Sequence, residues 1–251
     1  MGSIEKLFDT YSLNARVKPA FMLVFPIVIA LFTLFEPSRS WGGGAVTFIV
    51  SFGIISLAAN QMSTKGNILQ ERLFGKWGGA PTTIILRHSD LRLDKHTKSR
   101  YMARLQELIP NFLAVSVDQE CNDKNEADQM YRTAANYLRE HTRDTKKYPL
   151  VFKENISYGF SRNARAFKWL GTVISFFSLC VSVFVIWYRN AKGSDSSLLD
   201  LVFRIPFEQT ALVLLLLSML LIWIFFVTEK WVEVRAFTYA KALFASCEKL
   251  I

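Results

Sequence analysis

Basic side chains interleaved with aromatic ones are the residues of this chain best suited to chemistry, because together they can hold a phosphate-bearing ligand. Arg presents a planar fork of donors that matches phosphate oxygens, Lys supplies a point charge, and aromatic faces stack on bases. The cations predicted to form such a ligand site lie in two polar segments: Arg100, Arg104, Arg143, Lys146, Lys147, Lys153, Arg162 and Arg165. The alternative for the stretch 153–165 is contact with anionic lipid headgroups, worth about 1 kcal/mol per cation.

Residue types that usually carry catalysis form no recognisable motif. His88, His96 and His141 lack metal-ligand spacing with one another or with Cys121. Residues 87–90 (RHSD) contain serine-hydrolase residue types, but neighbours in sequence do not by themselves form a triad. There is no Walker-type or G-x-G-x-x-G phosphate loop. We therefore expect no enzyme activity, no catalytic residue, no metal site and no cofactor.

One apolar segment carries a stripe of small and hydroxyl residues on one helical face. At 100° per residue, the members fall within an arc of roughly 100–120°. Small residues let helices approach closely, which is the packing interpretation. In the functional interpretation the hydroxyls face water, and the predicted pore-lining residues are Thr172, Ser175, Ser178 and Ser182. Because four spans enclose little lumen, a pore requires a homo-oligomer.

Four blocks without Asp, Glu, Lys or Arg predict the elements that hold these residues: 19–35, 40–64, 169–188 and 209–228. A helix of about 20 residues crosses a hydrocarbon core of roughly 30 Å. Pro26 in the first block is compatible with a membrane helix. None of the blocks contains an ionisable residue of the kind that ion-coupled transporters need, so a transporter is disfavoured. We predict an all-α membrane protein with four spans.

The charge distribution predicts the orientation of these spans. Residues 61–166 hold 18 Lys or Arg and 12 Asp or Glu, whereas the connectors 36–44 and 189–208 are balanced in charge. Positive residues resist translocation. We therefore expect both termini and the long middle segment to be cytoplasmic, with two transmembrane helical hairpins flanking a mostly helical cytosolic domain. The predicted divisions are a cytosolic segment 1–18, a hairpin 19–62, a cytosolic domain 63–166, a hairpin 167–228 and a cytosolic helix 229–251.

Local signals within the cytosolic domain predict its helices. Asp94 is a suitable N-cap for a helix that Pro110 ends, and a second helix is predicted over 125–141. Gly78, Gly79 and Pro81 predict a turn before the apolar run 82–86, which suits a strand or the start of a helix. The stretch 153–165 is too irregular for a simple helix, and its Gly159 suggests a hinge.

The C-terminal segment contains apolar residues at alternating spacings of three and four, which is typical of a helix that packs on another helix. Two partners remain open: the chain's own cytosolic domain and a second subunit. The stripe comprises Phe237, Ala240, Phe244, Cys247 and Ile251.

Two runs resemble a group of bacterial membrane proteins encoded beside nucleotidyltransferase-like anti-phage genes: 75–105 (GKWGGAPTTIILRHSDLRLDKHTKSRYMARL) and 139–163 (REHTRDTKKYPLVFKENISYGFSRN). In particular, the chain is similar to the membrane effectors of Hailong-type systems. The resemblance implies a multimeric ion channel of the bacterial inner membrane, a partner nucleotidyltransferase, and control by a nucleotide or short single-stranded DNA. It supplies no ligand-binding residue.

Spans, charge and resemblance together lead to one expectation and one alternative. The expectation is an oligomeric ion channel in the lipid bilayer that responds to a nucleotide or short nucleic-acid signal in anti-phage defence. The alternative is a non-conducting membrane scaffold that recruits a soluble partner through its cytosolic domain. The two differ in whether the face that includes Ser175 and Ser182 meets water.

Overall fold

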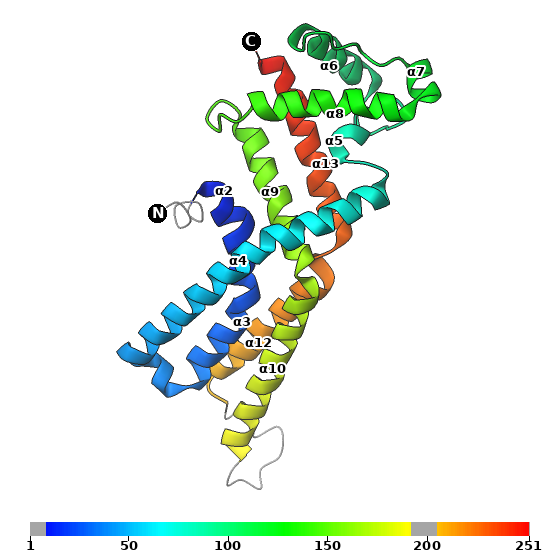
Figure 1. The fold of residues 1–251 in the computed structure, drawn as a ribbon. Coiled ribbons are helices and arrows are strands. Elements are labelled where there is room, and N and C mark those ends of the chain that lie inside the picture. The colour runs from blue at the N-terminus through cyan, green and yellow to red at the C-terminus, as the bar shows by residue number, and fades with distance from the viewer. Residues whose placement is uncertain (1–8, 192–204, 251) are drawn as a thin grey trace. The chain divides into compact units, whose positions relative to one another are not determined.

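Every regular element that the computed structural model describes, in residues 9–191 and 205–250, is helical (Figure 1). This confirms the all-α prediction. The longer helices are α3 (Lys18–Leu34), α4 (Trp41–Trp77), α6 (Lys95–Leu108), α8 (Lys124–His141), α9 (Pro149–Ala166), α10 (Lys168–Ala191), α12 (Phe207–Leu221) and α13 (Glu229–Ala245). Shorter elements are α2 (Thr10–Ser12), α5 (Pro81–Ile84) and α7 (Val117–Asn122), π turns at Leu13–Val17 and Ile222–Phe226, and 3-10 turns at Glu36–Arg39 and Ser246–Lys249.

Within the part of the chain that the structure describes, four helical stretches are long and apolar enough to cross a membrane, as the sequence predicts. They are Thr10–Leu34, Trp41–Ile84, Lys168–Asn190 and Phe207–Phe226. Pro26 lies inside α3 without ending it. The chain therefore has the composition and helix lengths of a multi-pass membrane protein.

The chain divides into two compact units. Unit 1 comprises residues 1–66 and 160–229, and unit 2 comprises residues 67–159 and 230–251. The sequence places the corresponding divisions after residues 62, 166 and 228. Helices α4 and α9 each contribute residues to both units.

Helices α3, α10 and α12 form the packed centre of unit 1, because each contacts the other two. A small apolar core includes Leu34, Ile186 and Leu216, all buried. A glycine permits close approach of two elements here: a Cβ at Gly171 would lie 2.3 Å from the Trp223 ring. Unit 1 therefore depends on shape complementarity between helices, as is common in membrane bundles.

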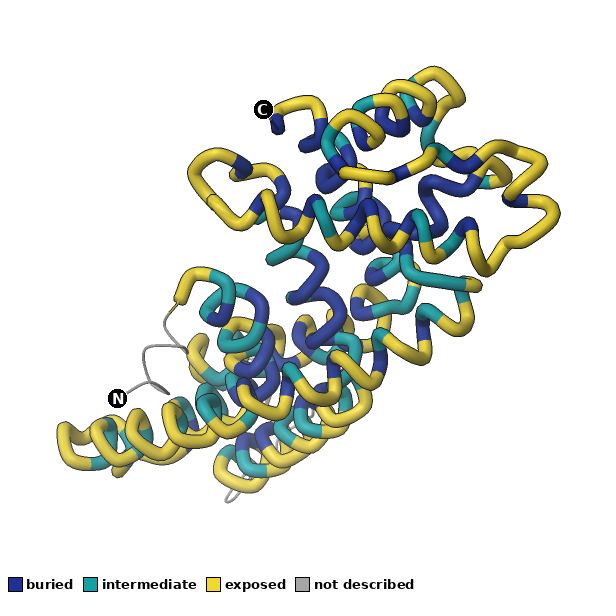
Figure 2. Tube along the Cα trace, turned by 45° about the horizontal axis from the view of Figure 1, so that its top comes forward, coloured by how far each residue is buried: buried dark blue, intermediate teal, exposed yellow. Residues whose placement is uncertain are grey.

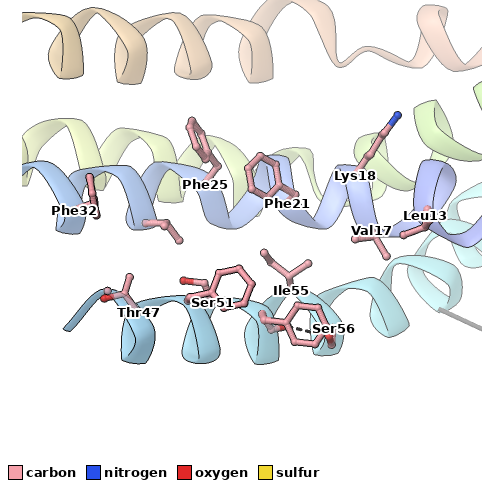
Figure 3. A pocket seen from close by; sticks show the side chains of 14 residues that line it. Leu13, Val17, Lys18, Phe21, Phe25, Phe32, Thr47, Ser51, Ile55 and Ser56 are labelled. Carbon is pink, nitrogen blue, oxygen red and sulfur yellow. Dashed lines mark hydrogen bonds between the residues drawn. The ribbon is translucent and has the colours of Figure 1, made fainter. Parts of the chain in front are cut away.

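Helix α4 packs far less closely than the other spans. Only 6% of its most apolar window is buried, compared with 33% for the first span and 22% for each of the last two. Its exposed apolar side chains include Phe48 (72% exposed) and Leu57 (70% exposed). Figure 2 marks exposed residues along the chain in yellow. A groove of about 730 Å³ separates part of α4 from α3 (Figure 3). The helix thus has a large surface available to lipid or to another protein.

Unit 2 has the larger apolar core, built from α5, α6, α8, the start of α9 and α13. Tyr131, Leu105 and Phe244 are completely buried in it. The sequence signals for its helices are confirmed. The Asp94 side chain accepts a hydrogen bond from the Thr97 N–H at 2.9 Å, and α6 ends just before Pro110. Helix α8 covers the predicted range 125–141.

The C-terminal stripe packs on the chain's own second unit. Phe237, Ala240, Phe244 and Cys247 are buried members of the unit 2 core, and Ile251 lies outside the described residues. Burial raises the pKa of the Cys247 thiol to about 12. The sequence leaves two partners open for this stripe, and the chain's own unit 2 is the partner of these four residues.

One local prediction is wrong: residues 153–165 are not irregular but form part of the continuous helix α9, which runs through Gly159. A helical glycine costs about 1 kcal/mol relative to alanine, which tertiary contacts can offset. Tyr158 supplies such contacts, since its hydroxyl donates to Gln70 Oε1 at 2.9 Å and its ring stacks on Tyr239. The break in the helix comes later, at Phe167.

The turn at residues 78–81 is confirmed. Gly78 (φ +80°) and Gly79 (φ +146°) both adopt conformations that L side chains rarely take. The run that follows is a helical turn, α5, rather than a strand. The alternative of a helix start is therefore the correct one for residues 82–86.

Candidate functional site

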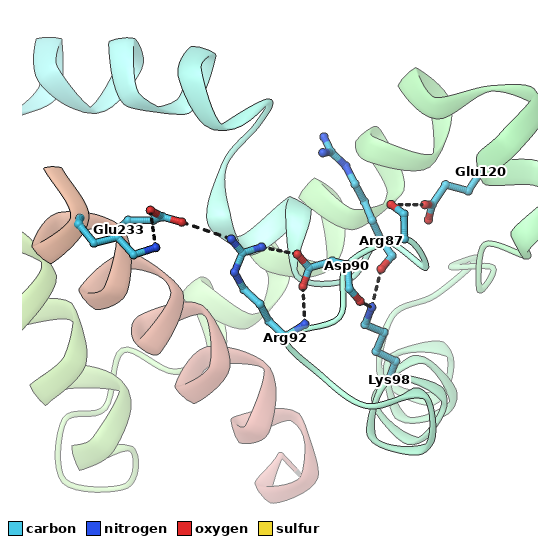
Figure 4. A network of polar contacts seen from close by, with 8 residues as sticks. Arg87, Asp90, Arg92, Lys98, Glu120 and Glu233 are labelled. Atoms are coloured by element: carbon cyan, nitrogen blue, oxygen red, sulfur yellow. Dashed lines mark hydrogen bonds and ion pairs between the residues drawn. The ribbon is translucent and has the colours of Figure 1, made fainter.

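A buried polar network holds the loop between α5 and α6 in unit 2 (Figure 4). Arg87 is 6% exposed, and it donates to the Asp128 carboxylate from Nε at 2.9 Å and from Nη2 at 2.7 Å. The same Nη2 donates to the Gly78 carbonyl at 2.7 Å. The hydrogen bond with Asp128 raises the pKa of Arg87. This bidentate pair joins the loop to α8 and to the glycine turn.

Glu120, on α7, is the second anchor of the network. It accepts hydrogen bonds from the His88 N–H at 2.8 Å and from the Tyr131 hydroxyl at 2.6 Å. Burial alone would raise the pKa of Glu120, but these hydrogen bonds lower it overall. Burial and the adjacent carboxylate raise the pKa of Tyr131. Glu120 is therefore held as an anion that accepts fixed donors.

Lys98 and Arg92 complete the network from the other side of the loop. Lys98 is 6% exposed and donates to the carbonyl oxygens of Arg87, at 2.5 Å, and of Asp90. Burial lowers the pKa of the Lys98 amine. Arg92 pairs with Asp90 and, at 3.3 Å, with Glu233, and its guanidinium lies 3.8 Å from the Phe237 ring centroid. These contacts attach the loop to α6 and α13.

A pocket of about 900 Å³ lies beside this loop. Its polar lining includes His88, Ser89, Asp90, Lys98, Glu120 and Cys121. A ring nitrogen of His88, Nε2, is 2.8 Å from the Val115 carbonyl oxygen, so the imidazole is already engaged. The described residues contain no group of three His, Cys, Asp or Glu side chains arranged to hold a metal ion. The charged side chains that line this pocket have both signs, so the pocket does not favour binding of a polyanion.

The cations predicted to bind a ligand fall into three groups, none of which lines that pocket. Arg100 and Arg104 form the first group and hold the C-terminal 3-10 turn. Arg100 pairs with Glu248, which raises the pKa of Arg100. Arg104 donates to the carbonyl oxygens of Cys247, at 3.4 Å, and of Leu250. Both side chains therefore have structural partners.

The second group, Arg143, Lys146, Lys147 and Lys153, is exposed and makes no ion pair with any described residue. We call residues 143–153 the basic segment. Asp144 shapes its turn by accepting hydrogen bonds from the amides of Lys146, at 2.8 Å, and Lys147, at 3.1 Å. Tyr148 is buried, and the Lys147 amine lies 5.6 Å from its ring centroid. Lys146 and Lys147 on this turn, Arg143 just before it and Lys153 on α9 are thus four cations accessible to an anion.

The third group lies in unit 1, near the end of α9. Arg162 is 9% exposed, and its Nε is 3.4 Å from Asn163 Oδ1. Asn163 in turn donates to the Ala15 carbonyl at 2.7 Å. Arg165 pairs with Glu229 at 3.1 Å. The structure therefore does not bring all eight predicted cations together within one unit.

The predicted pore face of α10 lies largely inside unit 1. Ser175 and Ser182 are completely buried, and neither hydroxyl has a hydrogen-bond partner among the described residues. Thr172 donates to the Lys168 carbonyl at 2.9 Å, and Ser178 is partly exposed. Within one chain, the two buried serines contact protein rather than water.

Sequence reasoning missed the central pair of the network. Arg87 and Asp128 are 41 residues apart and share no local motif. A local signal for α7 was present, however, in Ser116 and Gln119, which form a capping box. That signal would have placed Glu120 in the first turn of a helix, but it would not have identified His88 or Tyr131 as partners.

No protein-family model, curated protein or solved structure matches this chain.

Proposed function

We propose that the chain is an oligomeric membrane effector that conducts ions and that unit 2 receives a phosphate-bearing signal, a nucleotide or short nucleic acid. The resemblance of residues 75–105 and 139–163 to anti-phage membrane effectors supplies this ligand class and the defence context.

The observation that carries the proposal is the contrast in burial between α4 and the other spans. With only 6% of its apolar window buried, α4 has most of its surface free for neighbouring subunits. Gly53 and Asn60 are exposed on this helix, and the Asn60 amide makes no hydrogen bond to a described residue. A small residue permits close helix contact and an amide can bond across it or face water. In this proposal α4, rather than the buried face of α10, lines the conducting path.

The basic segment is the proposed sensor. Its four cations are exposed and have no carboxylate partner among the described residues, whereas Arg100, Arg104 and Arg165 already have one or more partners. Charge-assisted hydrogen bonds to phosphate are about twice as strong as neutral ones. A polyanionic ligand would therefore bind here without displacing an ion pair of the fold.

A non-conducting membrane scaffold remains the second candidate, because one observation favours it. The complete burial of Ser175 and Ser182 agrees with a packing role for the hydroxyl face of α10. The pocket of about 900 Å³ in unit 2 would then contribute to recruitment of a soluble partner.

Ion flux through liposomes that contain the purified full-length protein tests the proposal. We expect short single-stranded DNA to change the flux, and the double variant Lys146→Glu/Lys147→Glu to reduce that response at least tenfold. The matched control, Lys124→Glu/Arg132→Glu, reverses two exposed cations on α8 and should respond normally. Absence of flux with and without DNA, after correct insertion is confirmed, would favour the scaffold.

Cysteine accessibility distinguishes the two helices as pore walls. In a background with the native cysteines replaced, we expect a water-soluble thiol reagent to modify Asn60→Cys and Gly53→Cys faster than Ser175→Cys. Modification of Ser175→Cys alone would return the conducting path to α10. Protection of all three positions would favour the scaffold.

A further inference from the structure

The groove between α3 and α4 in unit 1 has the form of a site for a single acyl chain. It encloses about 730 Å³, and its lining includes Phe21, Phe25, Phe32, Phe48 and Phe52. Figure 3 shows Leu13, Val17 and Lys18 at one end, and Phe32 and Thr47 at the other. Large apolar side chains dominate along its length.

Small residues on α4 keep the groove open. Gly44, Thr47, Ser51 and Ser56 all line it. Two of the hydroxyls are satisfied by their own helix, since Thr47 donates to the Gly43 carbonyl at 2.8 Å and Ser56 to the Phe52 carbonyl at 2.9 Å. These two hydroxyls therefore do not need a polar ligand, and the groove suits a hydrocarbon.

Lys18 gives one end of the groove its charge. Among the lining residues, it alone carries a charge, and its exposed side chain has no partner among the described residues. Lys18 is also the first residue of α3. From Lys18 to Phe32 the helix rises about 21 Å at 1.5 Å per residue, which exceeds the roughly 15 Å of one bilayer leaflet. An acyl chain can therefore lie along the groove while its headgroup stays beside Lys18.

We propose that this groove binds an anionic phospholipid, with one acyl chain between α3 and α4 and the headgroup phosphate on the Lys18 amine. Charge complementarity selects an anionic headgroup, because a single unpaired cation stands at the end of an otherwise uncharged lining. The inference does not depend on ion conduction, and its test needs no measurement of flux.

Native mass spectrometry of the full-length protein in detergent, titrated with dioleoylphosphatidylglycerol or dioleoylphosphatidylcholine, tests this site. We expect Lys18→Gln to weaken phosphatidylglycerol binding about fivefold, which corresponds to ~1 kcal/mol for one basic residue near a headgroup. Phosphatidylcholine binding should change less than twofold. The matched control Lys65→Gln removes another exposed cation of unit 1 that does not line the groove, and it should retain the affinity of the parent protein. Equal losses in the two variants, or no loss in Lys18→Gln, would overturn the proposal.

A second variant tests whether the groove itself holds the chain. Ser51→Trp fills the groove, whereas Ile49→Trp places the same side chain at an exposed position of α4 outside the groove lining. We expect only Ser51→Trp to lower the number of retained phosphatidylglycerol molecules by one per chain. If Ser51→Trp instead changes the oligomeric state and leaves lipid retention intact, a second copy of the chain occupies the groove and the lipid proposal is wrong. The Lys18 comparison remains decisive if Ser51→Trp fails to fold.

Discussion

The loop network of unit 2 and helix α4 of unit 1 are opposites in burial: the network buries charged side chains, whereas α4 exposes apolar ones. In the network, Arg87, Lys98 and Glu120 are at least 91% buried, and each has fixed hydrogen-bond partners. Burying a charged group costs free energy unless the group is paired. Because all three charged side chains keep their hydrogen-bond partners in only one arrangement, the network fixes one conformation of the loop. In α4, by contrast, apolar side chains remain largely exposed.

The difference shows which interactions each environment can supply. Large apolar patches are unfavourable on a surface that faces water. Lipid tails, by contrast, are as apolar as a leucine side chain, so they give helices no hydrophobic reason to associate. Unit 2 therefore buries its apolar residues and fixes its loop with charge pairs. Unit 1 relies on close fits such as that of Gly171 against Trp223. Substitutions of matched chemistry in the two units should separate these two modes of stabilisation.

The largest effect should come from breaking the buried pair of unit 2. Arg87→Met leaves the Asp128 carboxylate and the Gly78 carbonyl without their donor, and we expect it to lower the free energy of unfolding of unit 2 by about 4 kcal/mol. Native-state hydrogen exchange of the α8 amides in the full-length protein measures this change. Lys95→Met, an exposed position at the start of α6, is the control and should cost less than about 0.5 kcal/mol. A loss below 1 kcal/mol for Arg87→Met would mean that the network does not fix the loop.

Overpacking should have the next largest effect, and it should be confined to unit 1. Gly171→Ala places a Cβ 2.3 Å from the Trp223 ring, so we expect a loss of about 2 kcal/mol. The reversible unfolding of the protein in mixed micelles, followed by circular dichroism, reports the change. Gly42→Ala is a matched control on α4, where a Cβ meets nothing within 4 Å. In a Trp223→Leu background the alanine should cost much less, because the ring that it meets is gone.

The pH dependence of unit 2 should come partly from Glu120. Its pKa is lowered in the folded protein from an ordinary value of 4.5, so its stabilising contribution is fully present above that value. The contribution is lost as the pH falls through the folded pKa, below 4.5. At pH 7, Glu120→Gln should cost about 1 kcal/mol, because neutral hydrogen bonds replace charge-assisted ones. Hydrogen exchange of α7 and α8 between pH 7 and pH 4 measures both effects, and an unaltered pH dependence in the variant would exclude Glu120 as a source.

The sequence predicts the elements that depend on local chemistry, and it fails where distant contacts decide. Uncharged blocks of sufficient length predict the four candidate spans, and Asp94 and Pro110 predict the bounds of α6. The helix across Gly159 depends instead on tertiary contacts of its neighbour Tyr158, which a local propensity cannot include.

The candidate site shows the same division. The composition of residues 143–153 identifies a basic segment, and its cations are indeed exposed in the structure. The partners of Arg100 and Arg104 lie at the C-terminal end of the chain, 143 to 148 residues away in sequence. Composition does not predict contacts between residues so far apart. Charge alone therefore does not distinguish a cation that supports the fold from one that is available to a ligand.

The smallest effect should be found at the edge of the unit 2 network, where Arg92 behaves as a surface residue. Its side chain is 41% exposed, and it meets two carboxylates and the face of Phe237. Exposed ion pairs contribute about 0.2–1 kcal/mol, and an exposed cation over an aromatic ring about 0.5–1 kcal/mol. We therefore expect Arg92→Gln to cost about 1 kcal/mol in the hydrogen exchange of α13, and added salt to reduce the difference from the parent protein. The same salt should leave the much larger cost of Arg87→Met nearly unchanged, because screening weakens exposed pairs more than buried ones. An equal response of the two variants to salt would remove the distinction between a buried centre and an exposed edge of the network.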